Sequence, residues 1–277
     1  MNVPPQTKVF VEGRYLKLSR DLPQTVFFCP DCKGHPRRRK KCERCEGFGK
    51  LTRDSIQELV AWVLGKAFGT RKQKFHGAGR EDVDVRMLGG GRPFVLELLN
   101  PKTTDVDLAH WEAEINQRNE GRLEIRGLHW TEKARVRIIK ESKHAKSYGA
   151  RVRFEGELDP ARIATTLDER RVIQQQTPSR VAHRRADKVR ERWVEYTSIK
   201  ELEPGLLDIA VLTEHGTYVK EAVSGEGGST TPSLSELLGV TCHCEELDVL
   251  NILAEDGQPE EVEPQRQDGR VGFGTGL

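Results

Sequence analysis

Hydrophobic and polar residues alternate in some stretches of the chain and recur at helical spacing in others. Residues 7–19 alternate roughly and contain β-branched and aromatic residues, which is typical of a strand. Residues 55–68 place apolar side chains on one helical face, and Ser55 with Glu58 forms a capping box at the start. Further helices are predicted at 105–118, 159–168, 218–224 and 233–238. Further strands are predicted at 83–88, 94–99, 122–129, 134–140, 148–155, 171–176, 188–200, 206–213 and 241–252.

These elements indicate an α+β fold with a large, mixed, mostly antiparallel sheet. Residues 89–91 are three glycines between two predicted strands, a pattern that favours a hairpin turn. The segment from residue 256 is rich in Gly, Pro, Gln and Glu, and we expect it to be disordered.

Composition narrows the class of protein. The 277 residues are long enough for about two domains and a substantial core. With 36% hydrophobic residues and no apolar run near the ~18 residues that span a bilayer, a membrane-embedded protein is excluded. The first ten residues have no apolar leader pattern, so we expect a cytoplasmic protein.

The net charge of +2 hides an uneven distribution. Residues 33–50 contain eight Lys or Arg against two Glu, and residues 170–192 contain eight against two acids. Residues 256–277 are acidic, with five acids against two Arg. Basic tracts of this kind are typical of surfaces that bind phosphate, although each tract taken alone also fits a solvated face.

Four of the six cysteines form two pairs, Cys29 with Cys32 and Cys42 with Cys45. Two such knuckles can supply four thiolates to one Zn²⁺, or to iron in its place, and a closed shell of this kind is structural. The alternative is four unrelated thiols. His35 is a spare ligand, and residues 37–41 present five successive cations between the pairs. We expect Cys242 and Cys244 to be small buried strand residues.

Residues 80–86 are unusual because Arg80, Asp82, Asp84 and Arg86 alternate along a predicted loop-to-strand junction. Paired acids and arginines on one face keep the carboxylates ionised. An exposed, salt-bridged strand explains the same pattern without any chemistry. Motifs typical of nucleotide binding, of zinc hydrolases and of serine hydrolases are missing from the sequence.

The segment GRED-VDVRMLG-GGRPFVLELLNP resembles the signature of the archaeal and eukaryotic tRNA pseudouridine synthases that act on positions 54 and 55 of the T-arm. RYLKLSRDLPQT at 14–25 and the cysteine pairs are similar to archaeal members. Residues 146–150, 176–187 and 216–221 resemble three further motifs of the family, so the resemblance spans about residues 8–252.

The resemblance implies a pseudouridine-synthase-like catalytic domain with a central active-site cleft and a small zinc-knuckle insertion built on four cysteines. It implies that Asp82 is the catalytic aspartate, a nucleophile or a base, that Tyr148 stacks on the target base, and that Lys220 pairs with the aspartate. It further implies that Arg80 helps to hold the flipped nucleotide and that Arg184 and Arg185 lie in the RNA-facing segment. The reaction is an isomerisation of uridine that needs no cofactor, so the only metal expected is a structural Zn²⁺ on Cys29, Cys32, Cys42 and Cys45.

The chain departs from this family in lacking most of the N-terminal THUMP-containing region, with some 28 residues before the first cysteine, and in a less basic segment after Lys220. We expect three parts: residues 1–50 with the knuckles, a catalytic domain at 51–255, and the tail at 256–277. We also expect a monomer that binds tRNA and no membrane. The alternatives are a non-catalytic zinc-containing RNA-binding protein and a pseudouridine synthase with another RNA substrate.

Overall fold

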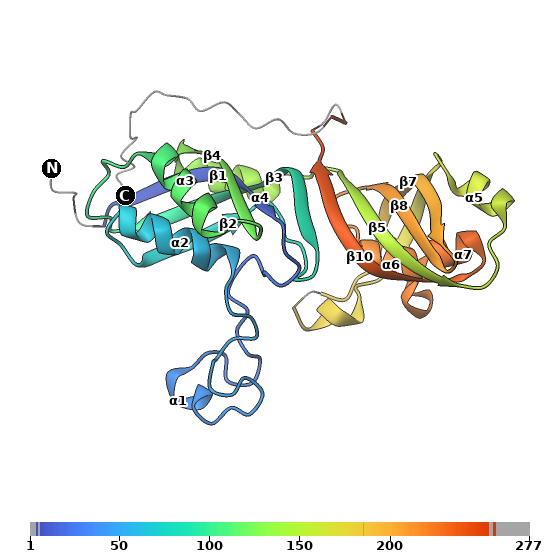
Figure 1. The fold of residues 1–277 in the computed structure, drawn as a ribbon, viewed down its shortest axis with the longest axis horizontal. Helices are drawn as coiled ribbons and strands as arrows, with labels where there is room; N and C mark the ends of the chain where they lie inside the picture. Colours follow the sequence, from blue (N-terminus) through green and yellow to red (C-terminus); the bar gives the residue numbers. More distant parts are fainter. Residues whose placement is uncertain (1–3, 5, 185, 255–256, 259–277) are drawn as a thin grey trace. The chain divides into compact units, whose positions relative to one another are not determined.

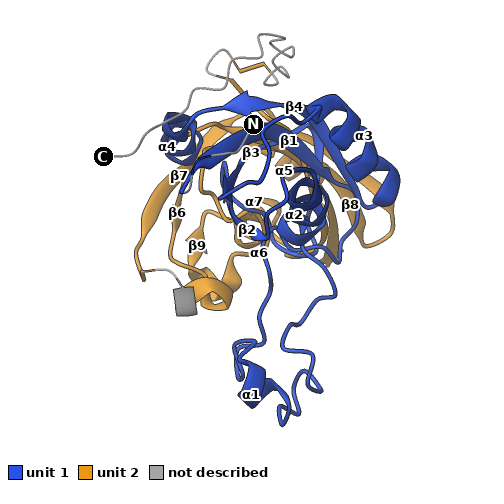
Figure 2. Ribbon diagram, turned by 90° about the vertical axis from the view of Figure 1, so that its left-hand side faces the viewer, with its two compact units in different colours: residues 1–142, 261–277 blue, residues 143–260 orange. Residues whose placement is uncertain are grey.

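The computed structural model describes residues 4, 6–184, 186–254 and 257–258, and the chain divides into two compact units. Unit 1 comprises Met1–Ser142 with Glu261–Leu277, and unit 2 comprises Lys143–Glu260 (Figures 1 and 2). Both units combine antiparallel strands with short helices, so the predicted α+β class with a large, mostly antiparallel sheet is confirmed. Among the helices within the described residues, none is long and apolar enough to cross a membrane.

In unit 1 the strands lie in the order β4-β1-β3, and β2 also pairs with β3. Val11 in the middle of β1 lies opposite Leu96 of β3 and Trp130 of β4, and it is fully buried. The strands are β1 (Lys8–Lys17), β2 (Lys72–Gly77), β3 (Arg86–Leu99) and β4 (Leu123–Thr131). The helices are α1 (Pro36–Arg39), α2 (Ile56–Ala67), α3 (Leu108–Arg118) and α4 (Lys133–Glu141).

Helices α2 and α3 begin at capping residues. The Ser55 side chain accepts a hydrogen bond from the Glu58 N–H at 3.2 Å, as the sequence predicts, and Asp107 accepts from the first turn of α3. The predicted apolar face of α2 is buried through Ile56, Val60, Val63 and Leu64. This helix therefore contributes to the core of unit 1.

In unit 2 the strands lie in the order β10-β5-β8-β7-β6-β9. They are β5 (Lys146–Glu155), β6 (Arg170–Gln175), β7 (Arg190–Glu203), β8 (Leu206–Thr213), β9 (Thr230–Thr231) and β10 (Thr241–Ile252). The helices are α5 (Pro160–Thr166), α6 (Val219–Ser224) and α7 (Leu234–Leu238), with 3-10 turns η1 (Ser179–Arg184) and η2 (Glu226–Gly228). All the longer strands and the helices of this unit were predicted at nearly these positions.

The strand predicted at 134–140 is wrong, because these residues form helix α4. Val136 and Ile139 are three residues apart and share the inner side of the helix, and Arg137 pairs with Glu141 one turn later at 2.9 Å. Ile138 is 52% exposed, and its apolar side chain made the stretch resemble an alternating strand.

The hairpin predicted around residues 89–91 is also wrong, because β3 is one continuous strand. Tyr15 lies opposite Arg92, whereas Lys17 lies opposite Met87, so the glycines form a bulge in β3. A Cβ on Gly91, which has φ +74°, would lie 2.9 Å from the Tyr15 carbonyl oxygen. The glycines therefore serve a close approach of two strands.

Strand β2 was not predicted, since it contains few apolar residues apart from Phe75. That ring stacks on Phe94 of β3 with centroids 5.1 Å apart, so tertiary packing decides the conformation. The predicted disordered tail at 256–277 lies outside the described residues except for 257 and 258.

Candidate functional site

Two predicted site residues lie in one loop of unit 1. Arg80 and Asp82 belong to residues 78–85, which connect β2 to β3; Arg80 is exposed and Asp82 is half-buried. Because β3 begins only at Arg86, the charged residues expected on one strand face lie mostly in a loop instead.

Glu81, between these two residues, points into the interior of unit 1. Its carboxylate accepts a hydrogen bond from the Tyr15 hydroxyl at 2.9 Å and from the Arg92 Nε at 2.8 Å. Both side chains of the Glu81–Arg92 ion pair are almost completely buried, so loss of one partner would leave a costly lone charge. The loop therefore holds one inward carboxylate directly beside Asp82.

Lys17 of β1 is the second buried charge beside this loop. Its Nζ donates to the carbonyl oxygens of Asp82 at 2.8 Å and Val83 at 2.9 Å. Burial lowers the pKa of Lys17 to about 8, although the nearby carboxylates of Glu81, Asp84 and Asp82 oppose that shift. The ammonium is therefore kept in an interior position at a cost in stability.

We expect that cost to depend on pH. The folded-state pKa of Lys17 lies below its ordinary value of 10.5, so the cost is complete below pH 8 and disappears as the pH rises toward 10.5. Lys17→Met removes the charge. In urea unfolding, the free energy of unfolding of the variant relative to the wild-type chain should fall by about 2 kcal/mol between pH 7.5 and 9.5. A difference that is the same at both pH values would contradict the assignment.

Tyr148 and Lys220, the other predicted active-site residues, lie in unit 2. Tyr148 is half-buried in β5, between Val211 of β8 and Val249 of β10. Lys220 is half-buried in the first turn of α6. The sheet and the helix therefore fix the backbone of each residue.

Helix α6 is fastened by two side chains of unit 2. Glu221, beside Lys220, is buried and accepts from Arg180 Nε at 2.5 Å and Nη2 at 3.1 Å. The side-chain amide of Gln175 accepts a hydrogen bond from the Tyr218 N–H at 2.8 Å and donates one to the Tyr218 carbonyl at 3.0 Å. The first turn of α6 is therefore anchored on either side of Lys220.

The second basic tract contains cations with internal partners. Arg180 pairs with Glu221, and Arg190 donates to Thr177 Oγ1 at 2.8 Å and to the Lys188 carbonyl at 3.0 Å. These two arginines hold the segment in place. Arg184 ends η1, but its side chain and all of Arg185 lie outside the described part of the chain.

The four predicted metal ligands come together in unit 1. The Sγ atoms of Cys29, Cys32, Cys42 and Cys45 all lie within 4.8 Å of one another, and the pairs Cys29–Cys42 and Cys32–Cys45 are each separated by 3.7 Å. A tetrahedral Zn²⁺ with Zn–S bonds of about 2.3 Å places its sulfurs about 3.8 Å apart. The donor set and its spacing therefore fit a structural zinc ion.

The cluster lies on a closed insertion between β1 and α2, which carries α1 at its far end (Figure 1). At its base the first N–H groups of α2, from Ile56 and Gln57, donate to the carbonyls of Pro23 and Gln24, each at 3.0 Å. We call residues 27–51 the knuckle. The segments that flank the knuckle are thus joined by backbone hydrogen bonds that do not involve the cysteines.

The knuckle presents both cations and aromatic rings. Arg37 to Lys41 are all exposed, and so are Phe27, Phe28 and Phe48. Lys50 Nζ lies 5.2 Å from the centre of the Phe48 ring. Surfaces that combine cations with stacking platforms are typical of proteins that bind unpaired nucleic acid.

Cys242 and Cys244 are buried in β10, as predicted. Burial raises the pKa of Cys242 to about 11, and Cys244 Sγ donates to the Glu246 carbonyl at 3.5 Å. The group of described residues that could hold a metal ion does not include them. They act as packing residues of unit 2.

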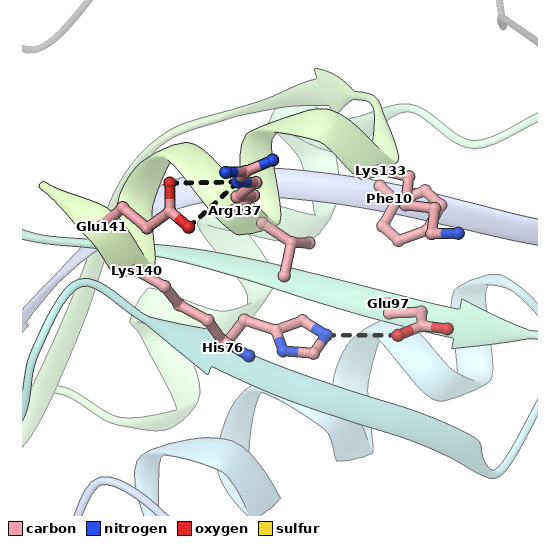
Figure 3. Close-up of a pocket in the computed structure, with 8 residues that line it drawn as sticks. Phe10, His76, Glu97, Lys133, Arg137, Lys140 and Glu141 are labelled. Carbon is pink, nitrogen blue, oxygen red and sulfur yellow. Dashed lines mark hydrogen bonds and ion pairs between the residues drawn. The ribbon is translucent and has the colours of Figure 1, made fainter.

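Unit 1 also contains a cavity of about 360 Å³ between α4 and its sheet (Figure 3). His76 lies 3.2 Å from Glu97, whose carboxylate also pairs with Lys8 and Lys74. Arg137 and Glu141 form a second pair at the rim. None of the predicted site residues lines this cavity.

Sequence reasoning missed the residues that hold the site, namely Tyr15, Lys17, Gln24, Glu81, Arg92, Gln175 and Glu221. The only available signal was a polar residue at a position facing the core, such as Lys17 beside the apolar residues of its strand. That pattern does not identify the partner, which lies 65 residues further along the chain.

Comparison with known proteins gives the class. The family model described as Pus10, C-terminal, matches residues 10–253, which is most of the chain. The chain therefore belongs to this family.

Several archaeal relatives named tRNA pseudouridine synthase Pus10 are similar to it. That of Methanopyrus kandleri is 44% identical over 253 residues, which cover 90% of this chain and 57% of the relative. The protein of Korarchaeum cryptofilum is 41% identical over 89% of this chain and 66% of its own. That of Archaeoglobus fulgidus is 41% identical over 88% and 67%. The chain thus spans between just over half and two-thirds of these relatives.

Among solved structures, a Cbf5-Nop10-Gar1 complex is similar over 70% of this chain and 44% of that one, with 21% identity and a TM-score of 0.40. This likeness is too distant to carry an argument about function.

Proposed function

We propose that the chain is a tRNA pseudouridine synthase that converts uridine to pseudouridine at position 54, position 55 or both in the T-arm. The match to the Pus10 C-terminal family over residues 10–253 carries this proposal. The relatives named tRNA pseudouridine synthase support it, and the substrate, the position and the residue roles are our inference.

The reaction breaks the N1–C1′ bond of uridine and joins C1′ to C5 of the same base, while the proton on C5 is lost and N1 gains one. No electron is gained or lost overall, so the proposed chemistry needs no redox cofactor. The base must leave its stack to react, at a cost of a few kcal/mol. The enzyme therefore has to bind an extruded nucleotide and hold a charged group beside its ribose.

Asp82 supplies that charged group. Its carboxylate either attacks C1′ as a nucleophile or removes a proton from the ribose as a base. Its half-buried position in a loop with many hydrogen bonds agrees with such a role. Arg80, exposed in the same loop, binds the extruded nucleotide through its phosphate.

Tyr148 and Lys220 complete the proposed set. The ring of Tyr148 stacks on the extruded base and recovers about 1–3 kcal/mol of the unstacking cost. Lys220 pairs with Asp82 and keeps the carboxylate ionised. Either water or the Tyr148 hydroxyl accepts the C5 proton. This assignment requires all three side chains to meet on one bound uridine.

The zinc knuckle and the second basic tract bind the tRNA backbone in this proposal. Zn²⁺ on Cys29, Cys32, Cys42 and Cys45 is structural, and it orders the loop that carries Arg37 to Lys41. We further propose that the catalytic domain extends over residues 51–255, that the chain acts as a monomer and that it works in the cytoplasm on tRNA.

Removal of two cations should change the salt dependence of tRNA binding. The double substitution Arg184→Ala with Arg185→Ala should weaken tRNA binding. It should also make the negative slope of log K against log salt shallower by about 1.4–1.8, which corresponds to two lost phosphate contacts. Arg137→Ala is a matched control, since this exposed arginine of α4 lies outside both basic tracts. Filter binding at several salt concentrations gives the slope, and an unchanged slope in the double variant would refute the assignment.

Release of tritium from tRNA labelled at C5 of uridine tests the activity itself. The proposal expects one tritium released per uridine converted, without added cofactor. Stable tRNA binding without any tritium release would favour the alternative of a non-catalytic RNA-binding protein. Release from another RNA only would favour a pseudouridine synthase with a different substrate.

A further inference from the structure

The loop that carries Asp82 has little secondary structure of its own. Within residues 77–85 the backbone makes two local hydrogen bonds. The Val85 N–H donates to the Asp82 carbonyl at 3.2 Å, and the Gly79 N–H donates to the Gly77 carbonyl at 3.1 Å. At its start, Ala78 N–H donates to Pro93. Such a segment needs other groups to hold its remaining polar atoms.

Side chains from outside the loop bind its carbonyl oxygens one after another. Arg92 Nη1 donates to Ala78, Gln24 Nε2 to Gly79 and Lys17 Nζ to Asp82, all at 2.8 Å, and Lys17 Nζ also donates to Val83 at 2.9 Å. Arg20 adds a bond to Asp84 at 3.1 Å at the surface. The carbonyl of Asp82 itself is one of these acceptors.

Two of the buried donors, Gln24 and Arg92, are also joined to each other through Tyr15 and Glu81. Gln24 Nε2 donates to the Tyr15 hydroxyl at 2.8 Å, and that hydroxyl donates to Glu81, which also binds Arg92. Each of these side chains is at most 7% exposed. Hydrogen bonds in a connected, buried network reinforce one another and permit few alternative arrangements. We call Tyr15, Lys17, Gln24 and Arg92 the loop cradle.

The pairing of β1 with β3 explains how the cradle assembles. Tyr15 and Lys17 are two residues apart on β1, so their side chains share one face of the sheet. The regular register of β1 and β3 places Arg92 opposite Tyr15, and the glycine bulge in β3 follows before Lys17 pairs with Met87. The sequence RYLKLSRDLPQT thus supplies three of the four cradle residues, together with Arg20.

We propose that the loop cradle is the positioning device for Asp82, which fixes the backbone on both sides of the reacting carboxylate before tRNA binds. The inference rests on the proposed function, because it takes Asp82 as the catalytic residue. Glu81 is the inward anchor of the same loop, and its buried ion pair prevents the loop from rotating Asp82 away. A displacement of about 1 Å in a reacting group can cost on the order of a hundredfold in rate.

A cradle that only stabilised the fold would behave differently from one that positions Asp82. Lys17→Met removes a buried charge and two bonds to the loop, and we expect the variant to be as stable as the wild-type chain at pH 7.5, or more so. A positioning role nevertheless predicts a slower reaction. Stability and rate therefore move in different directions in this one variant.

The experiment uses the full chain with Lys17→Met, with Tyr15→Phe, and with Glu12→Gln as control. Glu12 lies on the same strand and is buried, but its partners Arg135, at 2.6 Å, and Thr131, at 3.2 Å, belong to α4 and β4 rather than to the loop. Two quantities are measured well below the melting temperature: kcat and KM for tRNA, and the hydrogen exchange of the peptide containing residues 78–85.

Both cradle variants should lower kcat by about tenfold to a hundredfold with KM unchanged, and loop exchange should become at least about tenfold faster. The control Glu12→Gln should keep the wild-type kcat and the wild-type loop exchange, even if its melting temperature falls. Wild-type kcat or wild-type loop exchange in the cradle variants would overturn the inference. A wild-type chain that releases no tritium would refute the proposed function instead, and the exchange measurement would still decide whether the cradle holds the loop.

Discussion

Asp82→Asn should abolish the formation of pseudouridine while it leaves the fold and tRNA binding intact. The substitution keeps the size of the side chain and removes its charge, so neither a nucleophile nor a base remains beside the ribose. Loss of an essential catalytic side chain lowers kcat by at least about ten-thousandfold in a serine protease, and we expect a loss of that order here. Tritium release measures the rate, and filter binding with the melting temperature verifies that the variant still folds and binds.

The same loop provides a matched control for this prediction. Asp84 is an exposed acid two residues further on, and Asp84→Asn makes the same chemical change. We expect this variant to keep most of the wild-type kcat. Equal losses in the two variants would mean that the loop charge as a whole matters, and that Asp82 has no special role.

Loss of the zinc site is the second large effect that we expect. Cys32→Ser with Cys45→Ser removes two buried ligands, so the bound zinc should fall from one ion per chain to none by metal analysis. Because metal binding supplies most of the folding free energy of such small sites, the knuckle should unfold. The affinity for tRNA should then fall by at least about tenfold as the loop with Arg37 to Lys41 loses its order.

The rest of unit 1 should survive this change. The backbone bonds from Ile56 and Gln57 to Pro23 and Gln24 close the insertion without the cysteines. Cys242→Ala, which alters a buried cysteine of unit 2, serves as the control and should keep both zinc and affinity. A double variant that retains zinc, or loses it without any change in tRNA affinity, would contradict the role assigned to the knuckle.

The local pattern of apolar and polar residues was sufficient to predict most of the helices and strands. The apolar face of α2 and its Ser55 cap predicted that helix, and the cysteine pairs correctly predicted a cluster of four thiols because their spacing is itself the geometric requirement. The errors occurred where tertiary contacts decide the outcome. Strand β2 owes its place to Phe75 on Phe94, and α4 turns its misleading Ile138 outward.

The supporting residues of the candidate site were beyond the reach of sequence patterns. Lys17 resembles any polar residue of a strand until the loop at residue 82 is placed over it. Glu81 resembles one more charge beside Asp82, although it is the member of the pair that is buried. The resemblance to the family could indicate Asp82, but the contacts that hold it depend on the bulge at Gly91 and on a register that sequence alone does not specify.

The most direct test of the account is to incubate the purified chain with an unmodified tRNA transcript and map pseudouridine by carbodiimide modification and primer extension. The account predicts a new stop for position 54, position 55 or both with the wild-type chain, and none with Asp82→Asn. The absence of a stop at both positions with the wild-type chain, under conditions in which it binds the transcript, would contradict the central claim.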